Sequence, residues 1–177
     1  GSIANFTALA AARDAVDPGA AGTVILSDQV HASIPRALRL LGYPRDRIRV
    51  LPTDGDFRLP ADAVAAALDG SSDARILVAS AGTTNCGAVD PLGDLATLAE
   101  RHGCWLHVDG SYGAVAAALP EEAPRFAGMG LADSLAVDPH KWLFQPYDIG
   151  CTFVRRPGAL LSTFAMAPEY LKDTAAA

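Results

Sequence analysis

Short apolar segments alternate along most of the chain with longer stretches rich in alanine and leucine. The short segments show no alternation of polar and apolar residues, which is typical of strands covered on both faces of a sheet. The longer stretches are typical of helices. Strands are predicted at Thr23–Ser27, Ile48–Leu51, Ile76–Ser80, Trp105–Asp109, Ser134–Val137 and Cys151–Val154, and helices at Ser2–Ala15, Ile34–Leu41, Pro60–Leu68 and Leu92–His102.

This order of elements predicts βαβ units and therefore an α/β fold with a mostly parallel sheet flanked by helices. Ser2 is the expected N-cap of the first helix, and Asp17-Pro18-Gly19 is its expected stop. Asp90 precedes Pro91 and is expected to cap the helix that follows it.

Length and composition narrow the class of protein. The 177 residues are enough for one domain, since domains typically run ~100–200 residues, and the net charge of −6 argues against a nucleic-acid partner. No apolar run approaches the ~20 residues that a membrane span needs, and the first residues do not resemble a signal peptide. The three cysteines, Cys86, Cys104 and Cys151, are expected to be reduced core thiols in a cytoplasmic protein.

The use of basic residues is uneven. The chain has 14 lysines and arginines, of which only Lys141 and Lys172 are lysines. An amine can lose its proton and attack a carbonyl, whereas a guanidinium cannot. Lys141 follows a predicted strand in a hydrophobic stretch around Trp142, so we expect it to be desolvated, with a lowered pKa and a chemical role.

Polar residues follow four of the predicted strands. In open α/β sheets the ligand lies beyond the carboxyl ends of the strands, so these residues are expected along one edge. They are Asp28–His31, Gly82–Asn85, Asp109 and Asp138–Lys141.

This set of side chains suits a phosphorylated pyridine cofactor. A strand-end carboxylate beside a protonated pyridine nitrogen is worth roughly 4 kcal/mol at ~4 Å and an effective dielectric near 20, which keeps the ring cationic and able to accept electrons. The helix amino terminus at Gly1-Ser2 offers N–H groups to a phosphate, and His31 offers a ring that can lie against the cofactor. Many α/β proteins carry such residues, so this set of residues alone does not establish that the chain binds such a cofactor.

Several sequence blocks resemble the group II pyridoxal-5′-phosphate (PLP) dependent amino-acid decarboxylases, in family order and across nearly the whole chain. The block Pro139-His140-Lys141-Trp142 with its upstream aspartate is the most specific. The resemblance implies the large domain of the aspartate-aminotransferase-like fold, fold type I. The blocks are Gly1-Ser2-Ile3-Ala4-Asn5, Ser27–Ser33, Gly82-Thr83-Thr84, His107–Gly113 and Asp133–Leu143.

The resemblance also implies roles for single residues. Lys141 would bind the cofactor covalently, and Asp109 would pair with the pyridine nitrogen. His31 would stack on the cofactor ring and assist proton transfers, while Thr84 would place a hydroxyl nearby. Ser111 stands next to the ring, where relatives often carry alanine.

Four further positions match the phosphate side of the family's site. Gly1 and Ser2 would bind the phosphate, and Asp138 and His140 would flank the phosphate and the substrate. Some relatives carry asparagine at the position of Asp138.

Each of these residues also has a structural interpretation. Lys141 could be a surface lysine, Asp109 a cap, His31 a structural hydrogen-bonding residue, and Thr84 a turn residue. For Trp142 we expect core packing, and for the remaining histidines, His102 and His107, structural roles.

For the whole protein, the resemblance implies decarboxylation of an L-amino acid in a homodimeric enzyme of amino-acid metabolism. The blocks around Tyr112 and Trp142 resemble the aromatic-amino-acid branch of the family. We expect residues 1–177 to be one incomplete PLP-binding large domain, without the N-terminal segment, the mobile loop and the C-terminal small domain, and inactive by itself. Another PLP reaction, such as an aldehyde synthase or transaminase-like activity, and a non-catalytic remnant remain alternatives; His31 favours decarboxylation, because some aldehyde-forming relatives replace it.

Overall fold

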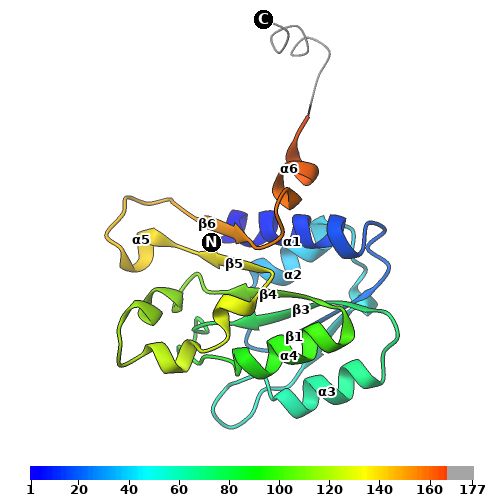
Figure 1. Cartoon of the computed structure of the whole chain (residues 1–177), viewed down its shortest axis with the longest axis horizontal. Helices are drawn as coiled ribbons and strands as arrows, with labels where there is room; N and C mark the ends of the chain where they lie inside the picture. Colours follow the sequence, from blue (N-terminus) through cyan, green and yellow to red (C-terminus); the bar gives the residue numbers. More distant parts are fainter. Residues whose placement is uncertain (167–177) are drawn as a thin grey trace, which may run out of the picture.

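The computed structural model describes residues 1–166 and contains one six-stranded sheet (Figure 1). The strand order is β2-β1-β3-β4-β5-β6. β1 to β5 run parallel, and β6 runs antiparallel to β5. This arrangement confirms the predicted mostly parallel sheet. The strands are β1 (Thr23–Ser27), β2 (Ile48–Leu51), β3 (Ala74–Ser80), β4 (Trp105–Asp109), β5 (Ser134–Val137) and β6 (Cys151–Val154).

Helices cover both faces of the sheet. One face packs against α1 and α2, and the other packs against α3 and α4 (Figure 1). Short 3₁₀ helices fill the connections around them. The helices are α1 (Ser2–Val16), α2 (Ser33–Leu40), α3 (Ala61–Asp69), α4 (Leu92–His102), α5 (Pro139–Trp142) and α6 (Ala159–Phe164), and the 3₁₀ helices are η1 (Arg45–Arg47), η2 (Ala114–Ala118), η3 (Ala123–Phe126) and η4 (Met129–Leu131).

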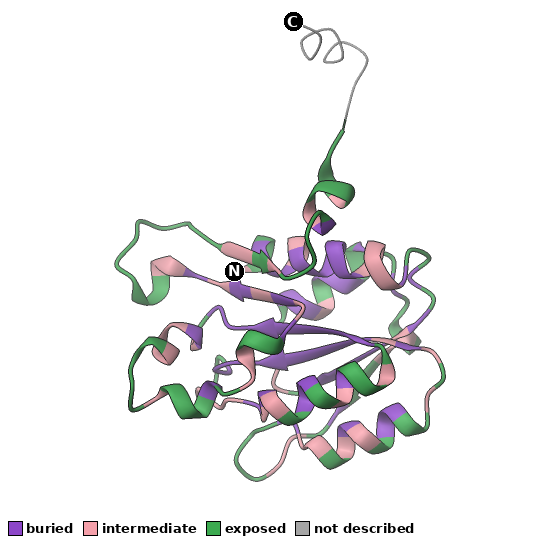
Figure 2. Cartoon of the chain, viewed as in Figure 1, coloured by how far each residue is buried: buried purple, intermediate pink, exposed green. Residues whose placement is uncertain are grey.

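The central strands are buried on both sides, as their uninterrupted apolar sequences indicate (Figure 2). β2 and β6 lie at the two edges of the sheet and are partly exposed, for example at Val50 and Phe153. The prediction that all strands are covered on both faces is therefore wrong for the edge strands, where these side chains remain exposed.

Two predicted helix caps are wrong. Gly1 is the N-cap of α1 and Ser2 is already helical, with no side-chain bond to the helix backbone. α4 likewise has no side-chain cap, and its N-cap is Pro91. The Asp90 carboxylate instead accepts hydrogen bonds from the backbone N–H of Leu59 at 2.8 Å and of Ser80 at 2.7 Å, so it joins β3 to the loop before α3.

The three cysteines are free thiols. Cys104 is buried, as expected for a core thiol, but Cys86 is exposed and Cys151 is only partly buried. The expectation that all three belong to the core is wrong, because Cys86 lies in the loop after β3 and Cys151 begins an edge strand. Among residues 1–166, no helix has both the length and the apolar character that crossing a bilayer requires.

Candidate active site

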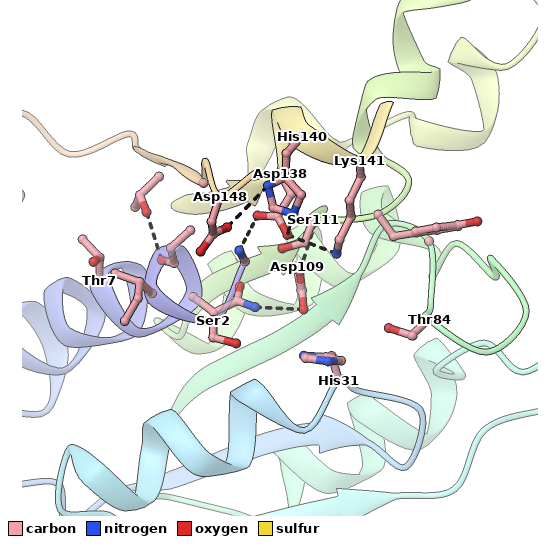
Figure 3. Close-up of a pocket in the computed structure, with 18 of the residues that line it drawn as sticks. Ser2, Thr7, His31, Thr84, Asp109, Ser111, Asp138, His140, Lys141 and Asp148 are labelled. Carbon is pink, nitrogen blue, oxygen red and sulfur yellow. Dashed lines mark hydrogen bonds and ion pairs between the residues drawn. The ribbon is translucent and has the colours of Figure 1, made fainter. Parts of the chain in front are cut away.

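A cavity of about 760 Å³ opens beyond the carboxyl ends of the parallel strands, next to the first turn of α1. Every residue that we predicted for the site lines it, although they come from segments far apart in the sequence (Figure 3). Strand-end residues from four strands therefore meet at one edge of the sheet, although Asp28, Gln29 and Asn85 do not line the cavity. The predicted site residues that line it are Gly1, Ser2, His31, Thr84, Asp109, Ser111, Asp138, His140 and Lys141.

Asp109 ends β4 at the base of the cavity and is 7% exposed. One carboxylate oxygen accepts a hydrogen bond from the side-chain amide of Asn5 at 3.0 Å, and the other from the backbone N–H of Ser111 at 3.1 Å. Both partners are hydrogen-bond donors, so each oxygen of the carboxylate has a suitable partner. Asp109 does not cap a regular α-helix, since the segment after it contains only 3₁₀ helices.

Lys141 lies on α5, directly after β5. Its Nζ atom is 3.1 Å from Asp138 Oδ2, and its side chain is 35% exposed. The expectation of a desolvated lysine is therefore wrong for this structure, because residues 141–150 form an exposed segment (Figure 2). Lys172 lies outside the described residues.

Asp138 connects this lysine to the amino terminus of α1. Its carboxylate is 2% exposed, and Oδ1 lies 2.6 Å from the Gly1 nitrogen. Burial raises the pKa of the Asp138 carboxyl, whereas the hydrogen bond and the positive charge of Lys141 act in the opposite direction. A Cβ atom added at Gly1 would lie 2.4 Å from Asp138 Oδ2, so only glycine fits here without a shift.

His140 holds the segment after α5. Its Nδ1 lies 2.6 Å from the Ile149 carbonyl oxygen, its Nε2 lies 4.0 Å from Asp138, and its ring packs edge-on against Tyr147. Nδ1 is also 3.5 Å from Asp148 Oδ1. His140 thus lies at the cavity, and its described contacts are to Asp138 and to residues 147–149.

His31 and Thr84 lie at the cavity from the loops after β1 and β3 (Figure 3). His31 Nδ1 is 2.9 Å from Ser33 Oγ and 3.3 Å from the Ser33 nitrogen. Thr83, and not Thr84, closes the following turn, since its hydroxyl accepts a hydrogen bond from the Ala88 N–H at 3.1 Å. The Thr84 side chain is exposed and faces the cavity.

Two glycines bring the loops after β3 and β4 together. A Cβ atom at Gly82 would lie 2.7 Å from Gly113 Cα, and Gly82 has φ +99°, a conformation that other residues rarely adopt. This close approach places Thr84 and Ser111 at the same cavity.

Asn5 has no predicted role, yet it touches several residues of the site. It is 1% exposed, and its side chain contacts Asp109, Ser33 and His107. The sequence offered one indication of a role for Asn5, its place in the family block Gly1-Ser2-Ile3-Ala4-Asn5. A polar residue in the first turns of a helix, however, is more often a surface residue. Thr7, Tyr147, Asp148 and Thr152 also line the cavity without having been predicted.

The other two histidines, His107 and His102, have different surroundings. His107 is 0% exposed and bonds to Asn5 and Ser134. Burial lowers its pKa to about 4, although the charge of Asp109 acts in the opposite direction. His102 lies at the end of α4, 3.3 Å from Asp69, so its contact is with a surface carboxylate.

Trp142 is 55% exposed and packs edge-on against Tyr112, with ring centroids 5.8 Å apart. The prediction that Trp142 packs in the core is wrong, because α5 ends at this residue and the chain then leaves the sheet. The pair borders an apolar cavity of about 450 Å³ beside the first one.

The fold and the site together define an α/β protein with a lysine and a buried aspartate at the carboxyl edge of a parallel sheet. The family model described as the pyridoxal-dependent decarboxylase conserved domain matches residues 2–177, and the chain belongs to this family. This confirms the family expected from the sequence blocks.

Known relatives support the same assignment. The aromatic-L-amino-acid decarboxylase of Bacillus atrophaeus is 44% identical over 98% of this chain and 38% of its own length. The structure of Oryza sativa TDC with PLP and tryptamine has a TM-score of 0.89 at 34% identity, covering 99% of this chain and 40% of that one. The Rhodiola rosea 4-hydroxyphenylacetaldehyde synthase has a TM-score of 0.84 at 30% identity, covering 92% and 37%. The chain thus spans about two fifths of the length of these relatives, and the expected fold class is confirmed.

Proposed function

We propose that this chain is the cofactor-binding part of a longer PLP-dependent enzyme that decarboxylates an aromatic L-amino acid to the amine and CO₂. The observation that carries the proposal is the meeting of Lys141 and the buried carboxylate of Asp109 at one cavity. Family membership and the names of the relatives support the reaction class.

The residues of the cavity fit PLP. Ser111 carries a buried hydroxyl that has no hydrogen-bond partner among the described residues. The first N–H groups of α1 have no acceptor within the helix, because the first turn of any α-helix leaves them free. A nucleophilic amine, a deep carboxylate acceptor and free N–H donors are the groups that an aldehyde, a protonated pyridine nitrogen and a phosphate require.

PLP, when bound, supplies a conjugated ring that accepts the electron pair released as CO₂ leaves. Asp109 would hold a proton on the pyridine nitrogen through its buried negative charge, a pairing worth roughly 4 kcal/mol at ~4 Å and an effective dielectric near 20. Lys141 would bind the cofactor covalently through Nζ. Asp138 orients that atom and lies where its Oδ2 can accept a proton from it.

His31, Thr84 and Ser111 would complete the contacts with the cofactor. His31 and Thr84 reach the cavity from one side (Figure 3), where the imidazole would stack on the ring and assist proton transfers. The Thr84 and Ser111 hydroxyls would hydrogen-bond to the ring substituents. The first turn of α1, from Gly1 and Ser2, would bind the phosphate, with Asp138 and His140 flanking it.

Two features of the cavity favour an aromatic substrate. Tyr112 and Tyr147 line it, and no arginine does so within residues 1–166. A dicarboxylic substrate usually requires a guanidinium to pair with its distal carboxylate. The names of several relatives, among them a tryptophan decarboxylase of Oryza sativa, favour the same substrate class.

We further propose that the whole protein is a cytoplasmic homodimer. Exposed apolar side chains between α5 and β6, at Leu143, Phe144 and Ile149, offer surface for a second subunit. The free thiols are consistent with a reducing compartment.

Covalent attachment is tested by borohydride reduction of the PLP-loaded full-length protein, followed by peptide mapping. The reduced cofactor is expected on Lys141, and Lys141→Arg should abolish the label because a guanidinium does not form the bond. A label found only on Lys172, or no label despite PLP binding, would contradict the proposed role.

Product analysis separates the two enzymatic candidates, since the fold is shared with an aldehyde synthase. The full-length protein is expected to release amine and CO₂, whereas aldehyde and ammonia would identify the alternative. Competition between tyrosine, tryptophan, glutamate and diaminobutyrate, measured as kcat/KM, tests the substrate class. A preference for glutamate or diaminobutyrate would show that the aromatic assignment is wrong.

A further inference from the structure

Asn5 lies beneath the cavity and connects two residues of the proposed site that do not touch each other. Its side chain is almost fully buried, and each of its polar atoms has a partner. Nδ2 donates to Asp109 Oδ2 at 3.0 Å and to Ser33 Oγ at 3.1 Å, while Oδ1 lies 3.0 Å from His107 Nε2. A buried carboxamide in this position fixes the direction of every hydrogen bond around it.

The orientation of the Asn5 amide follows from its partner Asp109. A carboxylate accepts hydrogen bonds and does not donate them, so the NH₂ group must face Asp109 and Oδ1 must face the other way. The reverse orientation would place Oδ1 against the negative charge and leave it without a donor on that side. Asn5 Oδ1 therefore requires a proton on His107 Nε2.

The other side of His107 is consistent with this assignment. Trp105 Nε1 can only donate, and it donates to Ser134 Oγ at 2.8 Å. The Ser134 hydroxyl is then free to donate to His107 Nδ1 at 2.9 Å. Burial keeps the imidazole neutral, since it lowers the pKa of His107 to about 4. In this chain of hydrogen bonds, each group thus donates to the next one in the direction from Trp105 to Asp109.

A second chain of hydrogen bonds leads from Asn5 through Ser33 to His31. Because Ser33 Oγ accepts a hydrogen bond from Asn5, its own hydroxyl proton is free to point at His31 Nδ1, 2.9 Å away. The backbone N–H of Ser33 points at the same nitrogen at 3.3 Å. Two donors directed at Nδ1 leave the proton of a neutral His31 on Nε2.

We propose that Asn5 is a positioning residue that holds the Asp109 carboxylate in place as a hydrogen-bond acceptor and, through Ser33, fixes the Nε2–H form of His31. Asp109 reaches the cavity from the end of β4, whereas His31 reaches it from the loop after β1 (Figure 3). One carboxamide therefore fixes the position of the carboxylate expected at the pyridine nitrogen and the donor face of the imidazole expected against the ring. This inference rests on the proposed function, because it concerns how the site receives PLP.

The first test is a double-mutant cycle on the full-length protein, with the dissociation constant of PLP as the readout. Asn5→Asp keeps the size of the side chain but replaces a donor to Asp109 by a second carboxylate. It is expected to weaken PLP binding by about tenfold to a hundredfold, the value of a buried hydrogen bond to a charged group. In the Asp109→Asn background the repulsion is absent, so the same substitution should have a much smaller effect.

Asn85→Asp is the matched control, since Asn85 is the other asparagine of the chain and is exposed in the loop after β3. Asn85→Asp adds the same charge away from the hydrogen bonds of Asn5. It should change PLP binding by less than about twofold, as surface substitutions usually do. If Asn5→Asp weakens binding by equal factors in both backgrounds, Asn5 only fills space and the inference is wrong. If the unmodified protein binds no PLP, the proposed function itself is wrong.

The second test needs no change at position 5, so it stands even if Asn5→Asp does not fold. Nitrogen NMR of the PLP-free full-length protein with ¹⁵N-labelled histidine reports which ring nitrogen carries the proton. His31 is assigned by the loss of its signals in His31→Gln. At a pH where the ring is neutral, the proton is expected on Nε2, and a proton on Nδ1 would overturn the proposed branch to His31.

Discussion

Asp90 and Asp109 are two buried aspartates that lie near the ends of neighbouring strands and face different surroundings. Asp90 is 2% exposed, and both of its oxygens accept hydrogen bonds from backbone N–H groups, those of Leu59 and Ser80. Asp109 is 7% exposed, accepts one bond from a side chain and one from the backbone, and lines the cavity. The first joins two segments of the chain, while the second has a face open to a ligand.

The comparison shows that burial by itself does not identify a functional carboxylate. Burial raises the pKa of Asp90 to about 6, although the two backbone hydrogen bonds act in the opposite direction. A perturbed pKa therefore occurs at the aspartate that has only structural contacts. What distinguishes Asp109 is its place at a cavity with Lys141, His31 and the Ser111 hydroxyl, which has no hydrogen-bond partner within residues 1–166.

The largest expected difference between the two aspartates is in turnover. Asp109→Asn in the full-length enzyme should lower kcat/KM by about a thousandfold, which corresponds to the roughly 4 kcal/mol estimated for the charge pair. Steady-state kinetics measure this loss, and circular dichroism checks that the variant folds. Near-normal turnover would show that Asp109 is as structural as Asp90.

Asp90 should instead affect stability. Asp90→Ala leaves the buried N–H groups of Leu59 and Ser80 unpaired, so the free energy of unfolding should fall by about 2–5 kcal/mol. Urea unfolding of the PLP-free protein measures the change. Asp90→Asn is the control, because it keeps one acceptor oxygen and should lose less.

The dissociation constant of PLP should stay unchanged in folded Asp90→Asn, since Asp90 lies outside the cavity. A large loss of PLP affinity with normal stability would remove the distinction between the two aspartates.

The last expected effect concerns the pH dependence of stability and the hydrogen bonds that support Asp109. Burial lowers the pKa of His107 from 6.5 to about 4 in the folded protein. The unfolded chain therefore takes up a proton at this histidine before the folded protein does, so stability is lost as the pH falls from about 6.5 towards 4. The slope due to one such group is at most about 1.4 kcal/mol per pH unit.

His107→Gln removes this titration and should flatten the pH dependence of the unfolding free energy between pH 4 and 6.5, measured by urea unfolding. The other histidines and the acids remain in both proteins, so the difference between the two curves isolates His107. Identical slopes would mean that His107 is not held neutral by burial.

The sequence by itself determined the α/β class, most strand limits and those strand-end residues that meet at the cavity. Strands buried on both faces are short apolar runs, as at Trp105–Asp109, and parallel strands bring their carboxyl ends to one edge. Local composition is enough for both features, because each depends on the pattern within one segment and on the general geometry of parallel sheets.

Only the tertiary structure decided the surroundings of Lys141, the contacts of Asp90 and the position of Asn5. Lys141 and Trp142 follow an apolar strand, yet they are exposed because the chain leaves the sheet after α5. Asn5 and Asp109 are separated by more than half of the chain, and they meet only because α1 packs against β4 and β5. Hydrogen bonds between such distant residues depend on how whole elements pack, which no local pattern of residues encodes.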